Sequence, residues 1–412
     1  MMKKLIIYTL VCIGLLTVPV FNAYSQNVYT YSSDHYVLVS GISEEFSEDT
    51  ASLLEGFFKL YTGYLHFDPK NLKAPMKVRI FADKTSFDSY LANYIDGNRS
   101  SFVFLQYPDP KRSELIAYRT TPQETFQRKL VHHAFVQYIK SFIPNPPLWI
   151  QKGFAVYFEN CTYDTSTKTA SFRPNHAWVA TLRQKLNEDS SLSNPEVFIP
   201  VRNLLFLDQT AALQNLEAFY AQSWGLIDFL IHSEKKAYNR LLWDAVAALE
   251  TDADMSVNEQ QVVARSFEWV AKDTLVEDFV EYILTLPTFP DLVQSGIDSY
   301  SMGRLEESEK YFQQALELRQ DHYVPHYYLG LIYYNRGEYS MAEFYYLSAA
   351  KKNGSTDLIY YALGVNAYAD NRIDDSTFYL SQSIDAAGSY SSLASELAEE
   401  IEGDSGSESD SM

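Results

Sequence analysis

The chain has 412 residues, with 33 basic and 53 acidic side chains and a formal net charge of −20. This length exceeds the size at which a single hydrophobic core stops growing, so two or more domains are expected. The acidic balance disfavours binding to nucleic acid or to anionic membrane surfaces. Its simplest role is to keep the protein soluble.

The first 25 residues have the pattern of a secretory signal peptide. Two lysines precede the apolar run 5–20, and Ala23 and Ser25 supply small residues before a cleavage site at Gln26. An uncleaved membrane anchor is the alternative, but the run is short for a bilayer span. We therefore expect an exported protein, periplasmic or extracellular, with no stable membrane span after cleavage.

Cleavage would leave Cys161 as the only cysteine, with 31 basic and 53 acidic side chains and a formal charge of −22. One cysteine cannot form an internal disulfide, so the fold is not expected to depend on disulfides. A lone cysteine is more often a small buried side chain than a nucleophile, and we expect Cys161 to be buried.

Residues 26–120 combine strand and helix patterns, and residues 121–288 are mostly helical. A capping box of Thr121 and Glu124 predicts a helix that continues to Phe142. Strands are predicted at 36–39, 76–82, 101–107 and 114–119, and the last two are expected to pair across the turn at 108–110. Helices are predicted at 47–65, 86–94, from about Pro147 to 158, and at 177–186, 213–232, 238–248, 257–264 and 274–284.

Residues 289–390 contain an internal repeat with a period of 34 residues. Five positions recur: Gly296, Gly330 and Gly364; Gly303, Gly337 and Asn371; Ser308, Ala342 and Ser376; Phe312, Tyr346 and Leu380; Ala315, Ala349 and Ser383. This pattern resembles tetratricopeptide repeats, which are stacked helix pairs. The resemblance implies about three repeats, with the large apolar residue filling the space between repeats. A capping helix at 390–402 and an acidic, disordered tail from 403 to 412 complete the segment 391–412.

Two neighbouring helical segments carry histidine, lysine and aromatic side chains. They read Arg128-Lys129-Leu130-Val131-His132-His133-Ala134-Phe135-Val136-Gln137 and Leu148-Trp149-Ile150-Gln151-Lys152-Gly153-Phe154-Ala155-Val156-Tyr157-Phe158-Glu159. These segments resemble the gluzincin-type peptidase MA-like family, in which one helix carries H-E-x-x-H and the next supplies a glutamate as third zinc ligand. With the similar segment 220–224, the resemblance spans about residues 30–285.

Carried over onto this chain, the first histidine of that family is His132. His133 replaces the glutamate that acts as general base, Val136 replaces the second histidine, and Lys152 replaces the third ligand. A single imidazole does not hold zinc against water, and a neighbouring ammonium group repels the cation. The resemblance therefore implies a vestigial site with no metal, no cofactor and no catalytic residue.

In tetratricopeptide repeats the first helix of each pair lines the concave face. The resemblance therefore places Tyr300, Tyr334 and Tyr368 in a groove, with Tyr327 and Tyr361 beside them. A row of rigid rings suits binding to a peptide or a partner helix. The alternative is that these tyrosines only pack the superhelix.

These features predict an α+β, mainly helical chain, in which a gluzincin-like domain with a small N-terminal sheet precedes an α-solenoid. They favour an exported, noncatalytic adaptor or scaffold of the cell envelope that binds a protein or peptide. A zinc metallopeptidase with unorthodox ligands, drawn from His176 or His232, is the alternative, and a structural subunit of an envelope assembly is a third reading. The vestigial cleft could also bind an extended peptide along a strand edge, for which 114–119 is the candidate.

Overall fold

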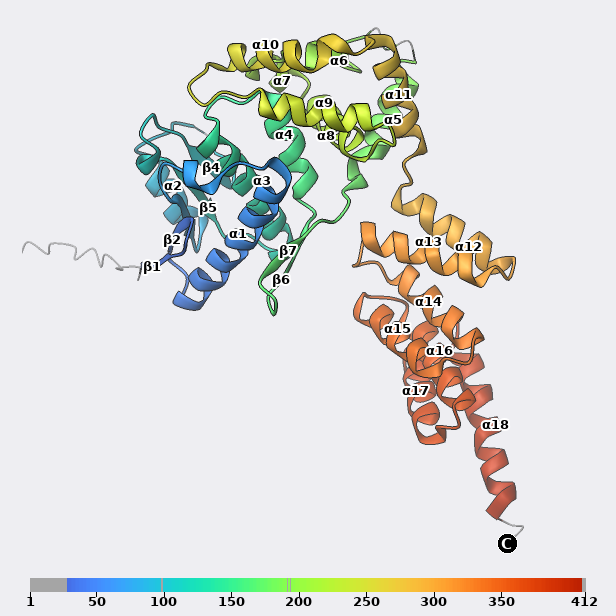
Figure 1. The fold of residues 1–412 in the computed structure, drawn as a ribbon. Helices are drawn as coiled ribbons and strands as arrows, with labels where there is room; N and C mark the ends of the chain where they lie inside the picture. The colour runs from blue at the N-terminus through green and yellow to red at the C-terminus, as the bar shows by residue number, and fades with distance from the viewer. Residues whose placement is uncertain (1–27, 98, 191, 193, 410–412) are drawn as a thin grey trace, which may run out of the picture.

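The computed structural model describes residues 28–97, 99–190, 192 and 194–409. The predicted signal peptide, residues 1–25, lies outside the described residues. The chain is mainly helical with a small sheet near its N-terminal end, which confirms the predicted α+β class (Figure 1). No helix among the described residues combines the length and the apolar character that a bilayer span requires.

The sheet has five strands in the order β1-β2-β3-β5-β4. Their bounds are β1 (Tyr29–Ser32), β2 (Tyr36–Ser40), β3 (Met76–Phe81), β4 (Phe102–Leu105) and β5 (Glu114–Tyr118). β2, β3 and β5 are parallel, and β1 and β4 pair antiparallel with β2 and β5. The predicted pairing of β4 with β5 is confirmed, but the expectation that 114–119 forms an edge is wrong. β5 lies between β3 and β4 and is buried on both faces, and the edge strands are β1 and β4.

Helices cover both faces of the sheet. α1 (Glu44–Leu65) and α3 (Gln123–Phe142) pack on the face that carries Leu115 and Ala117. α2 (Lys84–Leu91) covers the opposite face, where Phe87 and Leu91 contact Ile116. Successive side chains of a strand point to opposite faces, so β5 contributes to both cores.

The two long helices beside the sheet begin in different ways. The Ser43 hydroxyl caps α1 by accepting a hydrogen bond of 3.0 Å from the backbone N–H of Phe46. The capping box predicted at Thr121 is not formed. The Thr121–Pro122 peptide bond is cis, and Pro122 occupies the cap position without a side-chain hydrogen bond, so α3 begins at Gln123.

The helical part is built on the contact between α4 (Leu148–Phe158) and α8 (Leu216–His232). A Cβ atom at Gly153 would lie 2.4 Å from the backbone oxygen of Ser223, so only glycine allows this approach of the two backbones. The other helices are α5 (Val179–Glu188), α6 (Val201–Leu204), α7 (Gln209–Gln214), α9 (Lys236–Ala247), α10 (Met255–Arg265) and α11 (Lys272–Thr285). They confirm the predicted helices to within a few residues, apart from α6 and α7, which were not predicted as separate elements.

A short hairpin between α4 and α5 was also not predicted. It consists of β6 (Thr162–Asp164) and β7 (Thr169–Ser171), whose three-residue strands are too short to show a periodic pattern. Tyr163 lies against Gly56 of α1, and its hydroxyl is 2.8 Å from the Ser52 hydroxyl. The hairpin therefore packs on α1 through one tyrosine.

The C-terminal part consists of helix pairs that extend away from the sheet (Figure 1). The pairs are α12 (Phe289–Ser301) with α13 (Leu305–Leu318), α14 (Tyr323–Asn335) with α15 (Tyr339–Lys351), and α16 (Thr356–Ala369) with α17 (Ile373–Asp385). The large residue of each pair lies against the glycine of the same pair: Gly296 meets Phe312, Gly330 meets Tyr346 and Gly364 meets Leu380. The large residues were expected to fill the space between repeats, but each of them also packs within its own helix pair.

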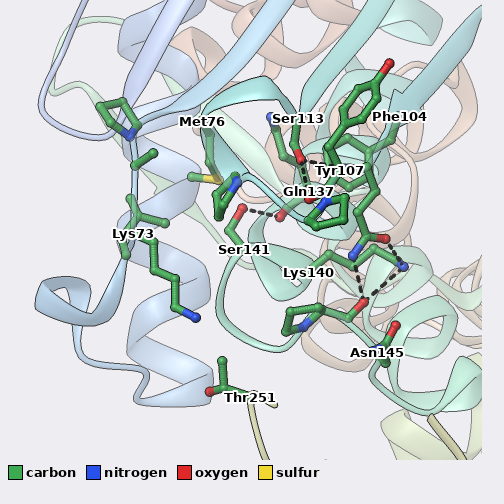
Figure 2. Close-up of a pocket in the computed structure, with 17 residues that line it drawn as sticks. Lys73, Met76, Phe104, Tyr107, Ser113, Gln137, Lys140, Ser141, Asn145 and Thr251 are labelled. Carbon is green, nitrogen blue, oxygen red and sulfur yellow. Dashed lines mark hydrogen bonds between the residues drawn. The ribbon is translucent and has the colours of Figure 1, made fainter. Parts of the chain in front are cut away.

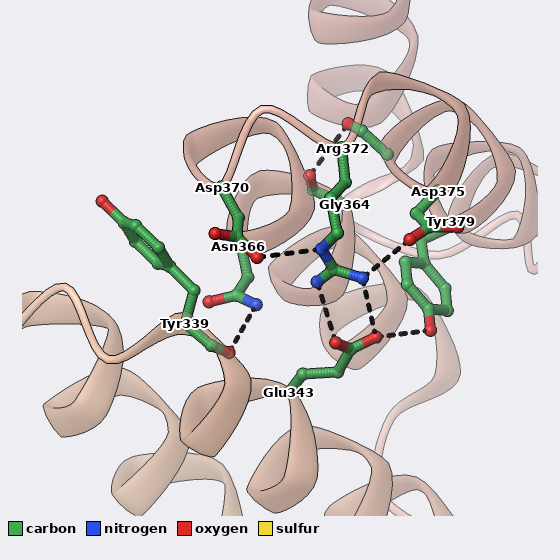
Figure 3. A network of polar contacts seen from close by, with 9 residues as sticks. Tyr339, Glu343, Gly364, Asn366, Asp370, Arg372, Asp375 and Tyr379 are labelled. Atoms are coloured by element: carbon green, nitrogen blue, oxygen red, sulfur yellow. Dashed lines mark hydrogen bonds and ion pairs between the residues drawn. The ribbon is translucent and has the colours of Figure 1, made fainter.

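Successive pairs are joined by partly buried ion pairs, whose glutamates, Glu309 and Glu343, recur at the repeat spacing. Arg336 contacts Glu309 at 2.7 Å, and Arg372 contacts Glu343 at 2.8 Å. Figure 3 shows the second network, in which the Tyr379 hydroxyl also donates to Glu343 at 2.8 Å. Each glutamate bridges two pairs, so these contacts hold the stacking angle as well as the helices.

The last helix, α18 (Ser391–Ser409), packs on α17 and α16. This is the packing expected of the predicted capping helix. The expectation of a disordered tail from residue 403 is wrong for residues 403–409, which continue the helix. No proline interrupts this segment, and its glutamates are compatible with a helix. Residues 410–412 lie outside the described part of the chain.

Arginine side chains join the helical part to the helix pairs. Arg173 donates from Nε to the Glu317 carbonyl at 2.6 Å and from Nη2 to the Leu316 carbonyl at 3.1 Å, at the C-terminal end of α13. Arg183 contacts Asp291 of α12 at 2.9 Å. A cation at the C-terminal end of a helix is favourably placed in the field of the helix dipole.

The α4–α8 contact gives a first prediction. Gly153→Ala is expected to destabilise the protein by about 2 kcal/mol, because the new methyl group forces two backbones apart. Gly63→Ala is the matched control, since a Cβ there meets nothing within 4 Å on the exposed side of α1. It is expected to stabilise by about 0.5–1 kcal/mol. Urea unfolding followed by tryptophan fluorescence measures both, and equal effects of the two changes would contradict the packing account.

Candidate functional site

His132 and His133, two of the four residues predicted to be vestigial, line a cavity of about 380 Å³ beside the edge of the sheet. α3 contributes Lys129, His132 and His133, and the segment leading into β4 contributes Ser101 and Phe102. The end of α4 and the start of α8 close the cavity with Glu159 and Tyr220. The structure thus brings together α3 and α4 as the sequence predicted, at an edge formed by β4 and not by 114–119.

His132 makes its main polar contact with Glu159, a residue that the sequence analysis did not select. The Nδ1 atom of His132 lies 3.1 Å from Glu159 Oε2, and the histidine is 8% exposed. The other oxygen, Oε1, accepts a hydrogen bond of 3.2 Å from the Asn175 amide and lies 3.5 Å from Arg128 Nη2. The ring of His132 also stacks on Tyr220, with centroids 6.1 Å apart. These contacts fix the imidazole as part of a hydrogen-bonded cluster.

Lys152 and Lys129 make the neighbourhood of His133 positive, and His133 itself is uncharged. Burial lowers the pKa of His133 well below its usual range, and His132, Lys152 and Lys129 lower it further. Its ring stacks on Phe102 with centroids 5.0 Å apart. Burial, followed by repulsion from Lys140, lowers the pKa of Lys152 to about 8. A lysine with this pKa is still mostly protonated at pH 7, so it repels a metal cation.

Val136 and Lys152 stand at the remaining positions of the vestigial site. Val136 is 5% exposed and belongs to the hydrophobic core. The Lys152 ammonium lies 5.7 Å from the centre of the Tyr220 ring, a cation–π contact. Within the described ranges, no three His, Cys, Asp or Glu side chains are arranged to hold a metal ion. The donor set around His132 is therefore one imidazole and one carboxylate that is already hydrogen-bonded.

Glu159 could have been found from its spacing. It follows Lys152 by seven residues, which is two helical turns and places both on one face of α4. The family motif places its third ligand at the position of Lys152 and assigns no role to position 159. A carboxylate further along the same face was therefore overlooked, although it lies closest to His132.

A second polar cluster gathers around His232 and Asp228 of α8. His232 Nε2 lies 3.0 Å from the Tyr157 hydroxyl and 3.8 Å from Asp228 Oδ1. The Tyr282 hydroxyl donates to Asp228 Oδ2 at 2.7 Å. His176 is close enough to lower the pKa of His232, although burial is the larger cause, and its own Nδ1 donates to the Pro287 carbonyl at 2.8 Å. The two histidines approach each other as expected, but they have separate partners.

Cys161 is 8% exposed, as expected for a structural thiol. Burial raises the pKa of its thiol to about 12, while a backbone hydrogen bond acts in the opposite direction. A thiolate is the reactive form of cysteine, so this side chain is poorly suited to nucleophilic chemistry.

The five tyrosines of the predicted groove are half-buried on the first helices of the three pairs. Tyr327 and Tyr334 pack on the core between the second and third pairs, around Tyr346. Tyr361 and Tyr368 pack on the core that α17 and α18 share. The rings therefore pack the superhelix, as the alternative reading expected.

The hydroxyl groups of these tyrosines differ from the rings in their contacts. Tyr300 accepts a hydrogen bond of 2.9 Å from the Asn335 amide. In the described part of the chain, the Tyr327, Tyr334, Tyr361 and Tyr368 hydroxyls have no hydrogen-bond partner, and none of them is fully buried. Packed rings with free hydroxyls form a rigid set of donors and acceptors.

Comparison with known proteins adds no family to this geometry. No protein-family model matches the chain, and no curated protein matches it.

The cluster around Asp228 gives a prediction about pH. Burial raises the pKa of Asp228 to about 7, although the Tyr282 hydroxyl lowers it. Between about pH 4 and pH 7 the native state keeps a proton that the unfolded chain releases, so this carboxyl lowers stability as the pH rises. Asp228→Asn is expected to remove that loss and to stabilise the protein by about 1 kcal/mol or more at pH 8, with little effect near pH 4.

Urea unfolding at pH 4, 6 and 8 measures this effect. Asp34→Asn, at an exposed position before β2, is the control and is expected to change stability equally at each pH. A constant difference between wild type and Asp228→Asn across the three pH values would show that Asp228 is ionised in the folded protein.

Proposed function

We propose that the chain is a noncatalytic, exported protein-binding adaptor whose helix pairs hold the partner. The pairs resemble tetratricopeptide repeats in period, in helix-pair geometry and in the glycine that meets a large residue in each pair. The observation that carries the proposal is the row of tyrosines whose rings are packed while their hydroxyls stay unpaired. Such groups lose little entropy on binding, because the stacked repeats already hold the rings in place.

The cleft around His132 supports the noncatalytic part of the proposal. Its contacts fit a relic of a gluzincin-type site: His132 bonds to Glu159, and Lys152 and Arg128 add positive charge. A zinc peptidase needs a ligand set that outweighs hydration of the ion and a general base for the bound water. Lys152 and Arg128 repel a cation, and Val136 stands where the second imidazole ligand would be needed.

One observation favours the alternative, a metallopeptidase with unorthodox ligands. His132, His133 and Glu159 line the same cavity, and their side chains carry three possible donors. The stacking of His133 on Phe102 and the hydrogen bonds of Glu159 to Asn175 and His132 would have to be broken for all three to face one ion. We therefore favour the adaptor.

The adaptor proposal predicts that hydroxyl groups alone control binding. A fourfold variant with Tyr327→Phe, Tyr334→Phe, Tyr361→Phe and Tyr368→Phe keeps the packed rings and removes only the free hydroxyls. Each hydrogen bond contributes about 0.5–1.5 kcal/mol, so the affinity for the partner is expected to fall at least about tenfold. The partner is first recovered from envelope extract with the wild-type protein, and its dissociation constant is then measured for both proteins.

A control variant, Tyr94→Phe with Tyr311→Phe, changes tyrosines away from the first helices of the pairs and should bind as the wild type does. Thermal unfolding confirms that all three proteins are folded. If the fourfold variant bound the partner with unchanged affinity, the tyrosine face would serve only to pack the helix pairs and the proposed binding surface would be wrong.

A further inference from the structure

A second cavity, of about 420 Å³, lies at the end of the sheet opposite to the His132 cleft. It is enclosed by the segment before β3, the segment after β4 and the C-terminal turn of α3 (Figure 2). Its volume falls in the range of small-ligand pockets. Met76, Phe104 and Tyr107 supply apolar wall, while Lys73 and Lys140 supply charge.

The two lysines make this cavity cationic in a chain that carries an excess of acids. No aspartate or glutamate lines it. Lys73 has only a loose contact of 4.0 Å with Asp252, whose side chain is 98% exposed. Lys140 has no ion-pair partner among the described residues, so the charge in the cavity is not neutralised by the protein.

Lys140 is held in place by neutral groups. Its ammonium donates to the Gln106 side-chain oxygen at 2.7 Å and to the Pro144 carbonyl at 3.3 Å, as Figure 2 shows. An ammonium group has three protons, so one donor is left for a ligand. Burial lowers the pKa of Lys140. An anion at this point would favour its charged form.

We propose that this cavity binds a carboxylate attached to an apolar body. The carboxylate accepts the third hydrogen bond of Lys140 and is attracted by Lys73, and the apolar body lies against Met76 and Phe104. A single carboxylate on an apolar body fits better than a large polyanion, because the cavity offers two cations together with the apolar side chains of Met76 and Phe104. This site is separate from the tyrosine face, so it stands or falls independently of the adaptor proposal.

The carboxylate can come from a free acid or from the C-terminus of a peptide, and paired probes distinguish them. 3-Phenylpropionate is compared with 3-phenylpropionamide, and a tripeptide ending in phenylalanine is compared with its C-terminal amide. Met76 lies in the wall, so the NMR signal of its ¹³C-labelled methyl group reports binding and is assigned through Met76→Leu. Saturable shifts with the acids and none with the amides are expected.

Variants then locate the charge. Lys140→Gln keeps a donor for the Pro144 carbonyl and is expected to weaken acid binding about tenfold, the loss of one charge-assisted hydrogen bond. Lys310→Gln, on the exposed side of α13, is the matched control and should bind as wild type.

Binding of the free acid alone would assign the site to small metabolites, and binding of both acids would extend it to peptide termini. Equal shifts with acid and amide, or no shift of the Met76 methyl signal up to millimolar acid, would overturn the proposal. Because the acid–amide comparison uses the unmodified protein, it remains decisive even if Lys140→Gln does not fold.

Discussion

The backbone contact between α4 and α8 at Gly153 determines what surrounds His132. It brings Tyr220 of α8 over the imidazole and fixes the face of α4 that carries Lys152 and Glu159. A side chain at position 153 would displace α4 and separate these groups. The packing frame of the cleft and the placement of its polar groups therefore depend on one glycine.

Packing and chemistry have separate requirements in this cleft. Trp149 and Trp224 remain fully buried, and Gly153 keeps two helices in backbone contact. A metal site needs in addition two or three electron-pair donors aimed at one point. His132 instead contacts the Glu159 carboxylate, which is also hydrogen-bonded to Asn175 and close to Arg128. The two helices therefore form a packed frame around a hydrogen-bonded cluster.

Much of the fold could be predicted from local pattern. The helical period identified α1, α3 and α8, and the 34-residue spacing identified Gly296, Gly330 and Gly364, whose contacts lie within single helix pairs. Contacts that depend on distant segments could not be predicted. The position of β5 inside the sheet depends on β4 folding back onto it, and the start of α3 depends on the geometry at Pro122.

The site could be predicted only in part, because local spacing places residues on a helix but does not show which distant segments they contact. His132, His133, Val136 and Lys152 lie on α3 and α4 as expected, because helical spacing fixes their faces. The contact of His132 with Glu159 depends on how the two helices cross, which the motif does not encode. For the tyrosines, sequence spacing indicated a common location, but only the packed structure separates buried rings from free hydroxyls.

Metal content tests the central claim, that the paired helices retain too few donors to hold a divalent ion. The protein is purified without chelators, equilibrated with zinc and desalted, and its zinc is measured by mass spectrometry. A variant with His133→Glu, Val136→His and Lys152→Glu, which introduces an H-E-x-x-H motif and a third carboxylate ligand, is the positive control. We predict less than about 0.1 zinc per wild-type chain and a clear gain in the variant. About one tightly held zinc per wild-type chain, lost together with a peptidase activity, would contradict the account.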